Sequence, residues 1–408
     1  MEWKEVRLGD VCNIITGFPF PGKKYSKEGI RVVRGDNVTI GNLRWDTEKD
    51  KRWNEPFDKT EYYSLQANDI VIGMDGSRVG KNKARIKEED LPLLLAQRVA
   101  CVRHNELAEQ DYLYYNIFSK KFIDYVNSIH TGSAIPHISQ KQIEDYKILL
   151  PNLETQRRIA SILSSLDRKI ELNNKINADL EEMAQAIFKN WFVDFEPFKD
   201  GKFVDSELGM IPEGWKVGRL DEIADVVGGS TPSKAKPEYY TQKGIAWLTP
   251  KDLSNHPAVY TSRGEIDITE EGYNSTSTKL MPKGTVLFTS RAPIGYISIA
   301  QNDICTNQGF KSLVPKKAGT CFLYCFLKYV TPEIENKSTG STFKEASGAL
   351  MKSLQVIMPE QKVFEDFEEI VCPLFARIES LEKENSRLSL LRDTLLPRLM
   401  SGELEVPE

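Results

Sequence analysis

A run of basic side chains between residues 76 and 87 is the first feature with evident chemistry. It holds five cations and no acid, and every second position is occupied by Lys81, Lys83, Arg85 and Lys87. On a β-strand, alternate side chains share one face, and a cationic face suits contacts to backbone phosphates. An edge strand protected by lysines has the same pattern, so both interpretations stay open.

Polar and cationic side chains in predicted loops beside short strands form the second group of candidates. Such side chains can read base edges in the major groove of DNA. They are Arg34, Asn37, Arg78, Lys81 and Lys83 in the first half of the chain, and Ser230, Thr231, Lys251, Ser290 and Arg291 in the second. The Gly-Gly-Ser-Thr-Pro loop at 228–232 would let a phosphate approach the backbone, although a turn between strands explains it equally well.

Signatures of catalysis are absent from the sequence. It has no phosphate loop, no Gly-x-Gly-x-x-Gly, no Gly-x-Ser-x-Gly and no His-Glu-x-x-His. Without a Pro-Pro dipeptide it also lacks the Asn/Asp-Pro-Pro-aromatic motif of amino methyltransferases. Residues 144–147 loosely resemble the end of a nuclease motif, but a connector into a strand fits better, and Asp36 and Asp252 suit turns or caps. We therefore expect no catalytic site and no bound cofactor.

The six cysteines give no indication of a metal site. None forms a Cys-x-x-Cys pair, and the chain has only four histidines. Cys321 and Cys325 have apolar helical spacing, and zinc would need two further ligands. We expect buried thiols and no metal.

Length and composition describe a globular protein of two or three domains. The chain has 408 residues, of which 40% are hydrophobic and 28% charged, which is enough apolar material for several cores. No stretch approaches the ~18 apolar residues of a membrane helix, and the charged start lacks a signal-peptide core, so we expect a cytoplasmic protein. The net charge is −5, but residues 1–150 and 209–358 are mildly basic, so local patches remain available to phosphate.

The chain contains an internal repeat. Residues 3–10 recur at 215–222 and residues 65–72 at 280–287. Shorter matches follow in the same order, namely Gly80 with Gly295, Gly132-Ser133 with Gly340-Ser341, Ser139 with Ser347, and Leu150-Pro151 with Met358-Pro359. The offset stays between 208 and 215 residues, as loop insertions would produce, so the chain consists of two homologous halves.

Each half begins with a module of mixed α/β (α+β) type, at 1–150 and 215–358. Both are rich in short β-like runs separated by Gly, Pro, Asn and Asp. The clearest runs are 30–33, 69–72, 244–248 and 285–288, and helical stretches follow at 111–129 and 321–335.

Each half ends in a predicted long helix, at 151–198 and 359–408. Apolar steps of three and four over several heptads are typical of a coiled coil. The stripe residues are Leu163, Leu166, Ile170, Asn177, Leu180, Ile187 and Trp191, then Val371, Leu374, Ile378, Leu381, Asn385 and Leu388. One helix cannot bury its stripe alone, so we expect an antiparallel pair, with 199–214 as a linker. Asn177 and Asn385 hold equivalent seam positions: they either lie near each other and fix the register, or are exposed where the stripe drifts.

Two similar but non-identical modules on a helical spacer suit a divided target. Successive major grooves of DNA are ~34 Å apart, and about 35 residues of helix extend ~50 Å. The organisation therefore predicts a DNA-sequence reader whose modules each read a different half-site.

The ordered motifs resemble one family over nearly the whole chain, the specificity subunit of type I restriction–modification systems. The matching segments are 17–21, 25–30, 32–36, 132–139, 150–151, 156–160, 170–195, 207–215 and, most specifically, 395–404. The resemblance implies two target-recognition domains that read an interrupted site in double-stranded DNA. It also implies helices that bind two methyltransferase (modification) subunits, together with restriction subunits that translocate and cleave DNA. S-adenosylmethionine, ATP and Mg are then expected on those partners and not on this chain.

One segment departs from the repeat, and two other functions remain open. Residues 340–347 lack the proline of 132–139, so we expect them to run more helically. A scaffold whose paired modules bind proteins would also fit the nearly neutral modules, and an enzyme with an unrecognised site is the remaining alternative.

Overall fold

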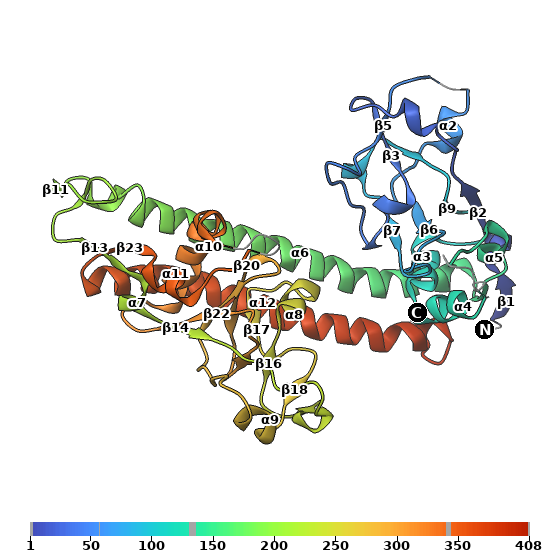
Figure 1. The fold of residues 1–408 in the computed structure, drawn as a ribbon. Coiled ribbons are helices and arrows are strands. Elements are labelled where there is room, and N and C mark those ends of the chain that lie inside the picture. The colour runs from blue at the N-terminus through green and yellow to red at the C-terminus, as the bar shows by residue number, and fades with distance from the viewer. Residues whose placement is uncertain (1–2, 57, 130–135, 340–343, 407–408) are drawn as a thin grey trace. The chain divides into compact units, whose positions relative to one another are not determined.

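The computed structural model describes residues 3–56, 58–129, 136–339 and 344–406, and the chain divides into two units. Unit 1 comprises Met1–Lys169 and Arg387–Glu408, and unit 2 comprises Ile170–Ser386. The long helices α6 (Leu153–Phe192) and α12 (Gln361–Met400) contribute one part to each unit. Each unit therefore contains one module and a part of both helices (Figure 1).

Unit 1 is built on a five-stranded sheet of order β2-β9-β6-β7-β4. In that order the strands are Cys12–Thr16, Val99–His104, Ile70–Gly73, Lys83–Arg85 and Ile40–Gly41. A second sheet joins β5 (Arg52–Trp53), β3 (Ile30–Val33) and β8 (Leu93–Leu95), and β1 (Lys4–Arg7) pairs with β10 (Lys147–Leu150). The short helices are α1 (Leu8–Val11), α2 (Thr60–Tyr63), α3 (Gln110–Phe118), α4 (Lys120–Ile129) and α5 (Gln140–Glu144).

Unit 2 repeats this topology with a five-stranded sheet of order β14-β22-β19-β20-β17. In that order the strands are Ala224–Gly228, Lys311–Pro315, Val286–Ser290, Ile294–Ala300 and Tyr260–Thr261. The remaining pairs are β16 (Trp247–Leu248) with β21 (Cys305–Thr306), β15 (Tyr240–Thr241) with β18 (Asp267–Ile268), β13 (Lys216–Arg219) with β23 (Gln355–Met358), and β11 (Phe203–Val204) with β12 (Ile211–Pro212). The helices are α7 (Leu220–Ile223), α8 (Pro250–Asn255), α9 (Glu270–Asn274), α10 (Thr320–Lys337) and α11 (Gly348–Ser353).

The two modules keep the same strand directions as well as the same order. The edge strands β4 and β17 pair parallel with β7 and β20, and β3 and β16 pair parallel with β8 and β21. The central strands β6 and β19 are buried along their whole length, as the apolar runs Ile70–Ile72 and Val286–Phe288 predict. The internal repeat thus corresponds to a duplicated mixed α/β module.

Two glycines explain why one part of the repeat is invariant. Gly80 and Gly295 both have positive φ, +78° and +97°, which other residues adopt only with strain. A Cβ atom at Gly80 would lie 2.9 Å from Val126, and one at Gly295 would lie 2.7 Å from Thr331. Each glycine therefore lets its sheet approach the helix that covers it, α4 in unit 1 and α10 in unit 2.

The long helices pair antiparallel within each unit. In unit 1, Leu163 and Leu399 belong to one buried cluster, and Arg392 donates to Asp167 at 2.8 Å. In unit 2, Phe188 and Phe367 lie in one core. Residue numbers therefore increase along α6 in the direction in which they decrease along α12. All predicted stripe residues are buried or half-buried, which agrees with the predicted antiparallel coiled coil.

The asparagine register differs from the predicted one. Asn173 donates to Asn385 Oδ1 and to Glu384 at 2.9 Å, and Asn385 donates to Asn174 Oδ1 at 2.8 Å. Asn177 lies one helical turn further along, and its buried Oδ1 has no hydrogen-bond partner among the described residues. The seam therefore contains a polar contact, but Asn173 and Asn174 make it instead of Asn177.

The segments that precede α5 and α11 are less different than the sequence predicts. Residues 344–347 are not helical, and α11 begins only at Gly348. Ser139 and Ser347 each cap the helix that follows, accepting from Gln142 N and Leu350 N. The repeated Gly-Ser pairs at 132–133 and 340–341 lie outside the described residues.

Candidate nucleic-acid interface

Each module has a hollow lined mainly by four corresponding loops. The loops follow β2, β3, β6 and β8 in unit 1, and β14, β16, β19 and β21 in unit 2. The first hollow, about 550 Å³, is lined by Phe20, Gly22, Tyr25, Arg34, Gly35, Asp36, Lys51, Asp75, Ala96, Gln97 and Arg98. The second hollow, about 920 Å³, includes Thr231, Lys234, Gln242, Lys251, Asp252, Glu265, Arg291, Asn307 and Gln308.

The first hollow presents arginines that local contacts hold in place. Arg34 pairs with Asp36 at 3.2 Å and lies over the Tyr25 ring at 5.7 Å. Burial raises the pKa of Tyr25, so this ring stays neutral beside the guanidinium. Arg98 has a positive φ of +69°, which turns its exposed side chain out of the β8–β9 connection, with Asp75 3.8 Å away.

The second hollow also contains paired polar and charged side chains. Thr231 donates to Gln308 across it, Lys251 pairs with Glu265 at 3.3 Å, and Arg291 pairs with Glu345 at 3.4 Å. The Lys251 and Glu265 side chains are more than 70% exposed, so their ion pair is weak and easily exchanged for another partner.

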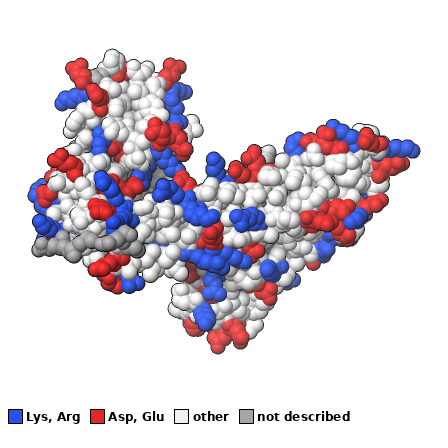
Figure 2. Space-filling view, turned by 180° about the vertical axis from the view of Figure 1, so that it is seen from behind, with Lys and Arg blue, Asp and Glu red and all other residues white. Residues whose placement is uncertain are grey.

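Charge in both hollows is mixed, with a small cationic excess. Three cations and two carboxylates line each of them. Lys and Arg are likewise interspersed with Asp and Glu over the visible face of the described residues (Figure 2). Such a lining offers donors to base edges and single phosphates without the strong field of a basic groove.

Three of the predicted contact residues are buried in the framework. Asn37 is fully buried, accepts from Arg34 N and donates to two carbonyls. Ser290 is fully buried and donates to Gly309 O at 3.1 Å. Lys83 is 3% exposed and donates to Gly80 O at 3.0 Å, with Phe118 and Phe122 against its ammonium. These side chains position loops and strands and do not reach either hollow.

The alternating basic face is not present in the folded chain. Lys81 and Lys87 are exposed, Lys83 is buried, and Arg85 is half-buried and pairs with Asp111. The strand β7 is only three residues long, so Lys81 and Lys87 lie in the connections at either end. This corrects the expectation of one cationic face.

The other predicted residues fall into two groups. Arg34, Thr231, Lys251 and Arg291 line the hollows. Arg78 and Lys81 are exposed on the β6–β7 connection outside the lining, and Ser230 is half-buried, its carbonyl accepting from the Trp247 indole. In the 228–232 loop, Gly229 approaches the backbone of residues 306–307, so its small size serves the chain's own packing.

Asp36 lies in the short 3-10 turn Gly35–Asn37, but a neighbouring residue makes the cap contact. Asp252 accepts from Thr249 N at 2.7 Å at the start of α8, as its predicted cap role requires. In unit 1 the same i, i+3 contact is made by Asn37 to Arg34 N, whereas Asp36 is exposed. The counterpart of Asp252 is therefore Asn37.

Sequence reasoning missed the loop between β8 and β9 and its counterpart. Gln97 and Arg98 are exposed there, and Gln308 is exposed after β21. In the parallel pair β3–β8, Val33 lies opposite Leu95, and in the parallel pair β16–β21, Leu248 lies opposite Thr306. Gln97 and Gln308 each follow two residues later, so they occupy equivalent positions. The shared glutamine, 211 positions apart, was the available signal.

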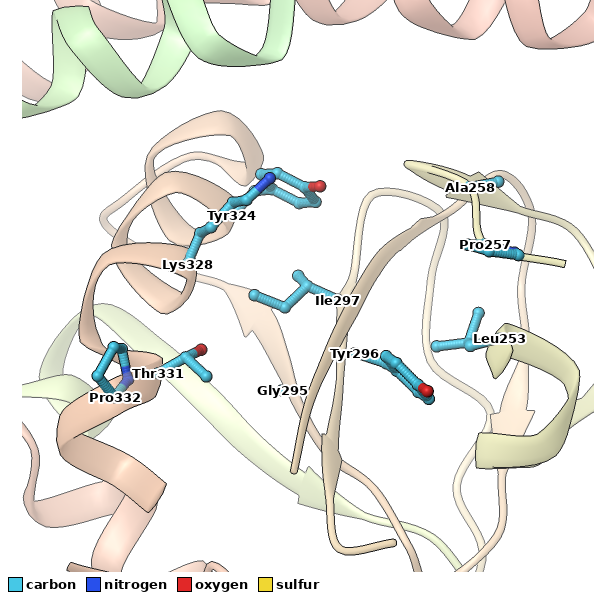
Figure 3. Close-up of a pocket in the computed structure, with 10 residues that line it drawn as sticks. All are labelled: Leu253, Pro257, Ala258, Gly295, Tyr296, Ile297, Tyr324, Lys328, Thr331 and Pro332. Atoms are coloured by element: carbon cyan, nitrogen blue, oxygen red, sulfur yellow. The ribbon is translucent and has the colours of Figure 1, made fainter. Parts of the chain in front are cut away.

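A smaller cavity of about 300 Å³ in unit 2 lies between α10 and the sheet (Figure 3). Tyr324 and Lys328 both contact Glu181 of α6, and Gly295 faces Thr331. Apart from Lys328 its lining is uncharged, so we regard it as a packing gap beneath α10.

None of the described helices is long and apolar enough to cross a membrane.

Comparisons with known proteins give a consistent result. A family model described as the type I restriction modification DNA specificity domain matches residues 1–182 and 212–388. The HindI specificity subunit of Haemophilus influenzae is 26% identical over 469 residues, covering 99% of this chain and 100% of that protein. The MjaIX specificity subunit of Methanocaldococcus jannaschii is 39% identical over 190 residues, which are 46% of this chain and 44% of that protein.

A solved structure supports the fold independently. The crystal structure of a type I restriction–modification S subunit from M. genitalium matches with a TM-score of 0.58 and 17% identity. The match covers 98% of this chain and 96% of the other.

Proposed function

Because the chain belongs to the family of type I restriction modification DNA specificity domains, we propose that it reads double-stranded DNA in two parts, one with each module. The chain is a specificity component of such a system and not its catalytic subunit. The observation that carries the proposal is the pair of corresponding hollows. Their framework is the same and their linings differ, so each would read a different half of an asymmetric site.

The contacts follow from the cationic and amide side chains of the two linings. Arg34 and Arg98 in the first hollow and Arg291 and Lys251 in the second suit guanine O6 and N7, while the equivalent glutamines suit adenine. Each of these cations already has a carboxylate neighbour. DNA would therefore replace a solvent-accessible ion pair with a charge-assisted contact.

The long helices would set the gap between the two half-sites. A helix of 40 residues is about 60 Å long, and major grooves recur on one face of DNA every ~34 Å. The polar contacts between the helices would fix their register. The pair would then keep the distance between the two half-sites at a fixed number of base pairs.

The same helices would carry the partner subunits. Large apolar side chains are exposed on them, namely Leu172, Met183, Ile370, Leu390 and Leu391. Exposed apolar side chains of this size are candidates for contact with another protein. We propose two methyltransferase subunits and restriction subunits as those partners, with S-adenosylmethionine, ATP and Mg bound by them and not by this chain.

The proposal is tested by co-expressing the chain with the methyltransferase subunit of the same system and mapping methylated adenine across the genome. The expected result is one motif of two short parts separated by a fixed gap. Exchanging residues 1–150 for those of a relative should change one part only, and inserting one heptad in both helices should change only the gap.

Two results would contradict the proposal. A complex that forms but methylates no motif would indicate a scaffold whose modules bind something other than DNA. A motif whose two parts both change when residues 1–150 are exchanged would refute the assignment of one part to each module.

A further inference from the structure

Two cysteines from separate helices meet in unit 2, beside one carboxylate. Cys321 lies in the first turn of α10, and Cys372 lies on α12, one turn after Glu368. The two Sγ atoms are 3.0 Å apart. Cys321 is buried and Cys372 is exposed. A solute can therefore reach the Cys372 sulfur first, and the Cys321 sulfur lies behind it.

The carboxylate of Glu368 is held rigidly between the two helices. It accepts hydrogen bonds from Phe322 N at 2.7 Å and from Cys321 N at 3.3 Å. Both N–H groups lie in the first turn of α10, where the helix itself offers no acceptor. The Cys372 thiol donates to the same carboxylate at 3.0 Å. The hydrogen bond to Glu368 therefore fixes Cys372 Sγ directly beside Cys321 Sγ.

The fold itself does not require this cluster. The repeat offset of 208 residues places Ala160 and Ser164 at the positions of Glu368 and Cys372. Unit 1 packs its module against α6 with a small apolar side chain and a hydroxyl there. The sulfur pair is therefore specific to unit 2, and packing of a long helix against a module does not need it.

We propose that Cys372 and Cys321 are a peroxide-sensitive thiol pair that closes to a disulfide between α12 and α10. The Cys372 sulfur attacks one peroxide oxygen and the O–O bond breaks. The thiol proton leaves with the other peroxide oxygen as water or an alcohol, and a sulfenic acid remains at Cys372. Cys321 sulfur then attacks the Cys372 sulfur, its proton and the sulfenic hydroxyl leave as water, and the S–S bond forms. One peroxide is reduced by two electrons for each pair of thiols oxidised.

The order of the two steps follows from the environments of the sulfurs. The hydrogen bond with Cys372 and burial raise the pKa of Cys321, so Cys321 remains a thiol while Cys372 meets the oxidant. Closing to a bond of about 2.05 Å requires about 1 Å of movement, which side-chain rotation supplies.

The same atoms are a poorer match to zinc. Two sulfurs bound to one tetrahedral zinc at about 2.3 Å lie about 3.8 Å apart, further than the 3.0 Å found here. Glu368 Oε1 and Oε2 are both already engaged by backbone N–H groups. The cluster Cys321, Glu368 and Cys372 would have to open and give up those bonds to hold a metal.

The test treats the reduced full-length protein with hydrogen peroxide and maps its cysteines by non-reducing mass spectrometry. We expect a Cys321–Cys372 cross-link that dithiothreitol reverses, and a rise of about 5 °C in the unfolding temperature of unit 2. Cys321→Ser should leave a sulfenic acid on Cys372 that dimedone labels. Cys372→Ser should abolish both products, and Cys325→Ser, a buried neighbour on α10, should change neither.

Several results would overturn the inference. These are direct over-oxidation of Cys372 in the unsubstituted protein, a cross-link that survives in Cys372→Ser, and stoichiometric zinc that is retained on purification and lost in Cys372→Ser. Because none of these readouts involves DNA, failure here is distinguishable from failure of the proposed reading function.

Discussion

Replacing Lys83 by methionine tests whether this lysine is a buried part of the framework or a phosphate contact. The side chain is 3% exposed, and burial lowers the pKa of its amine to about 7. In the unfolded chain the amine returns to about 10.5. The unfolded state therefore binds more protons than the folded state between pH 7 and pH 10.5, so Lys83 destabilises unit 1 most at low pH and ceases to do so above pH 10.5.

The size of this penalty follows from the two pKa values. It amounts to about 4 kcal/mol at pH 7 and about 2 kcal/mol at pH 9. The hydrogen bond to Gly80 O and the rings of Phe118 and Phe122 offset part of it. Methionine has similar length and no charge, so Lys83→Met should stabilise unit 1 by about 2–4 kcal/mol at pH 7.

Urea unfolding of both proteins at pH 6, 7, 8 and 9 measures the effect. The free-energy gap between variant and unsubstituted protein should narrow by about 2 kcal/mol from pH 7 to pH 9. Lys81→Met, an exposed neighbour, should show no such gap. A constant gap, or a variant that is less stable at every pH, would refute the burial argument, and a lower salt dependence of DNA binding in Lys83→Met would show that Lys83 contacts phosphate after all.

Three further predictions concern the hollow, the packing and the seam. Arg98→Ala in the assembled complex should cost about 1–3 kcal/mol in DNA affinity and relax one base position of a single half-site, as measured by binding to a library of variant sites; a uniform loss at all positions would contradict base reading. Gly295→Val should destabilise unit 2 by more than 2 kcal/mol because its Cβ would lie 2.7 Å from Thr331, whereas Gly76→Val, with equally positive φ and open space, should cost only about 1–2 kcal/mol in unit 1; equal thermal shifts would disprove the close-approach explanation. Asn385→Leu should cost about 1–3 kcal/mol by urea unfolding, because it removes a partner of the buried amide at position 173; an unchanged or higher stability would show that the seam contact does not stabilise the pair.

The framework was predictable because it depends on periodicity and repetition. Apolar spacing identified both long helices, and the unpaired stripes implied their antiparallel association. The repeated glycines at 80 and 295 marked a point where the fold tolerates no side chain in either half. These features depend on patterns along the sequence and not on the details of loop geometry.

The lining of the hollows was only partly predictable because it depends on which loops meet. Lys83 and Ser290 have side chains suited to DNA contact, but the central part of the sheet and the helix above it enclose them. Arg98 was missed because its neighbours in sequence are apolar strands, and only the parallel pairing of β3 with β8 brings its loop beside Arg34. Asn173 replaced Asn177 in the seam because a shift of one turn preserves the apolar stripe.

The division of the chain into units has a consequence for its synthesis. Unit 2 is one continuous segment, Ile170–Ser386, whereas unit 1 needs the final segment Arg387–Glu408. In unit 1, Leu399 lies in the same buried cluster as Tyr112 and Ile159, and Trp3 packs against it. Because Leu399 follows the whole of unit 2 along the sequence, this cluster can close only after Ile170–Ser386 has been synthesised. The two larger cores of the first module draw only on residues 6–150 and can form before that point.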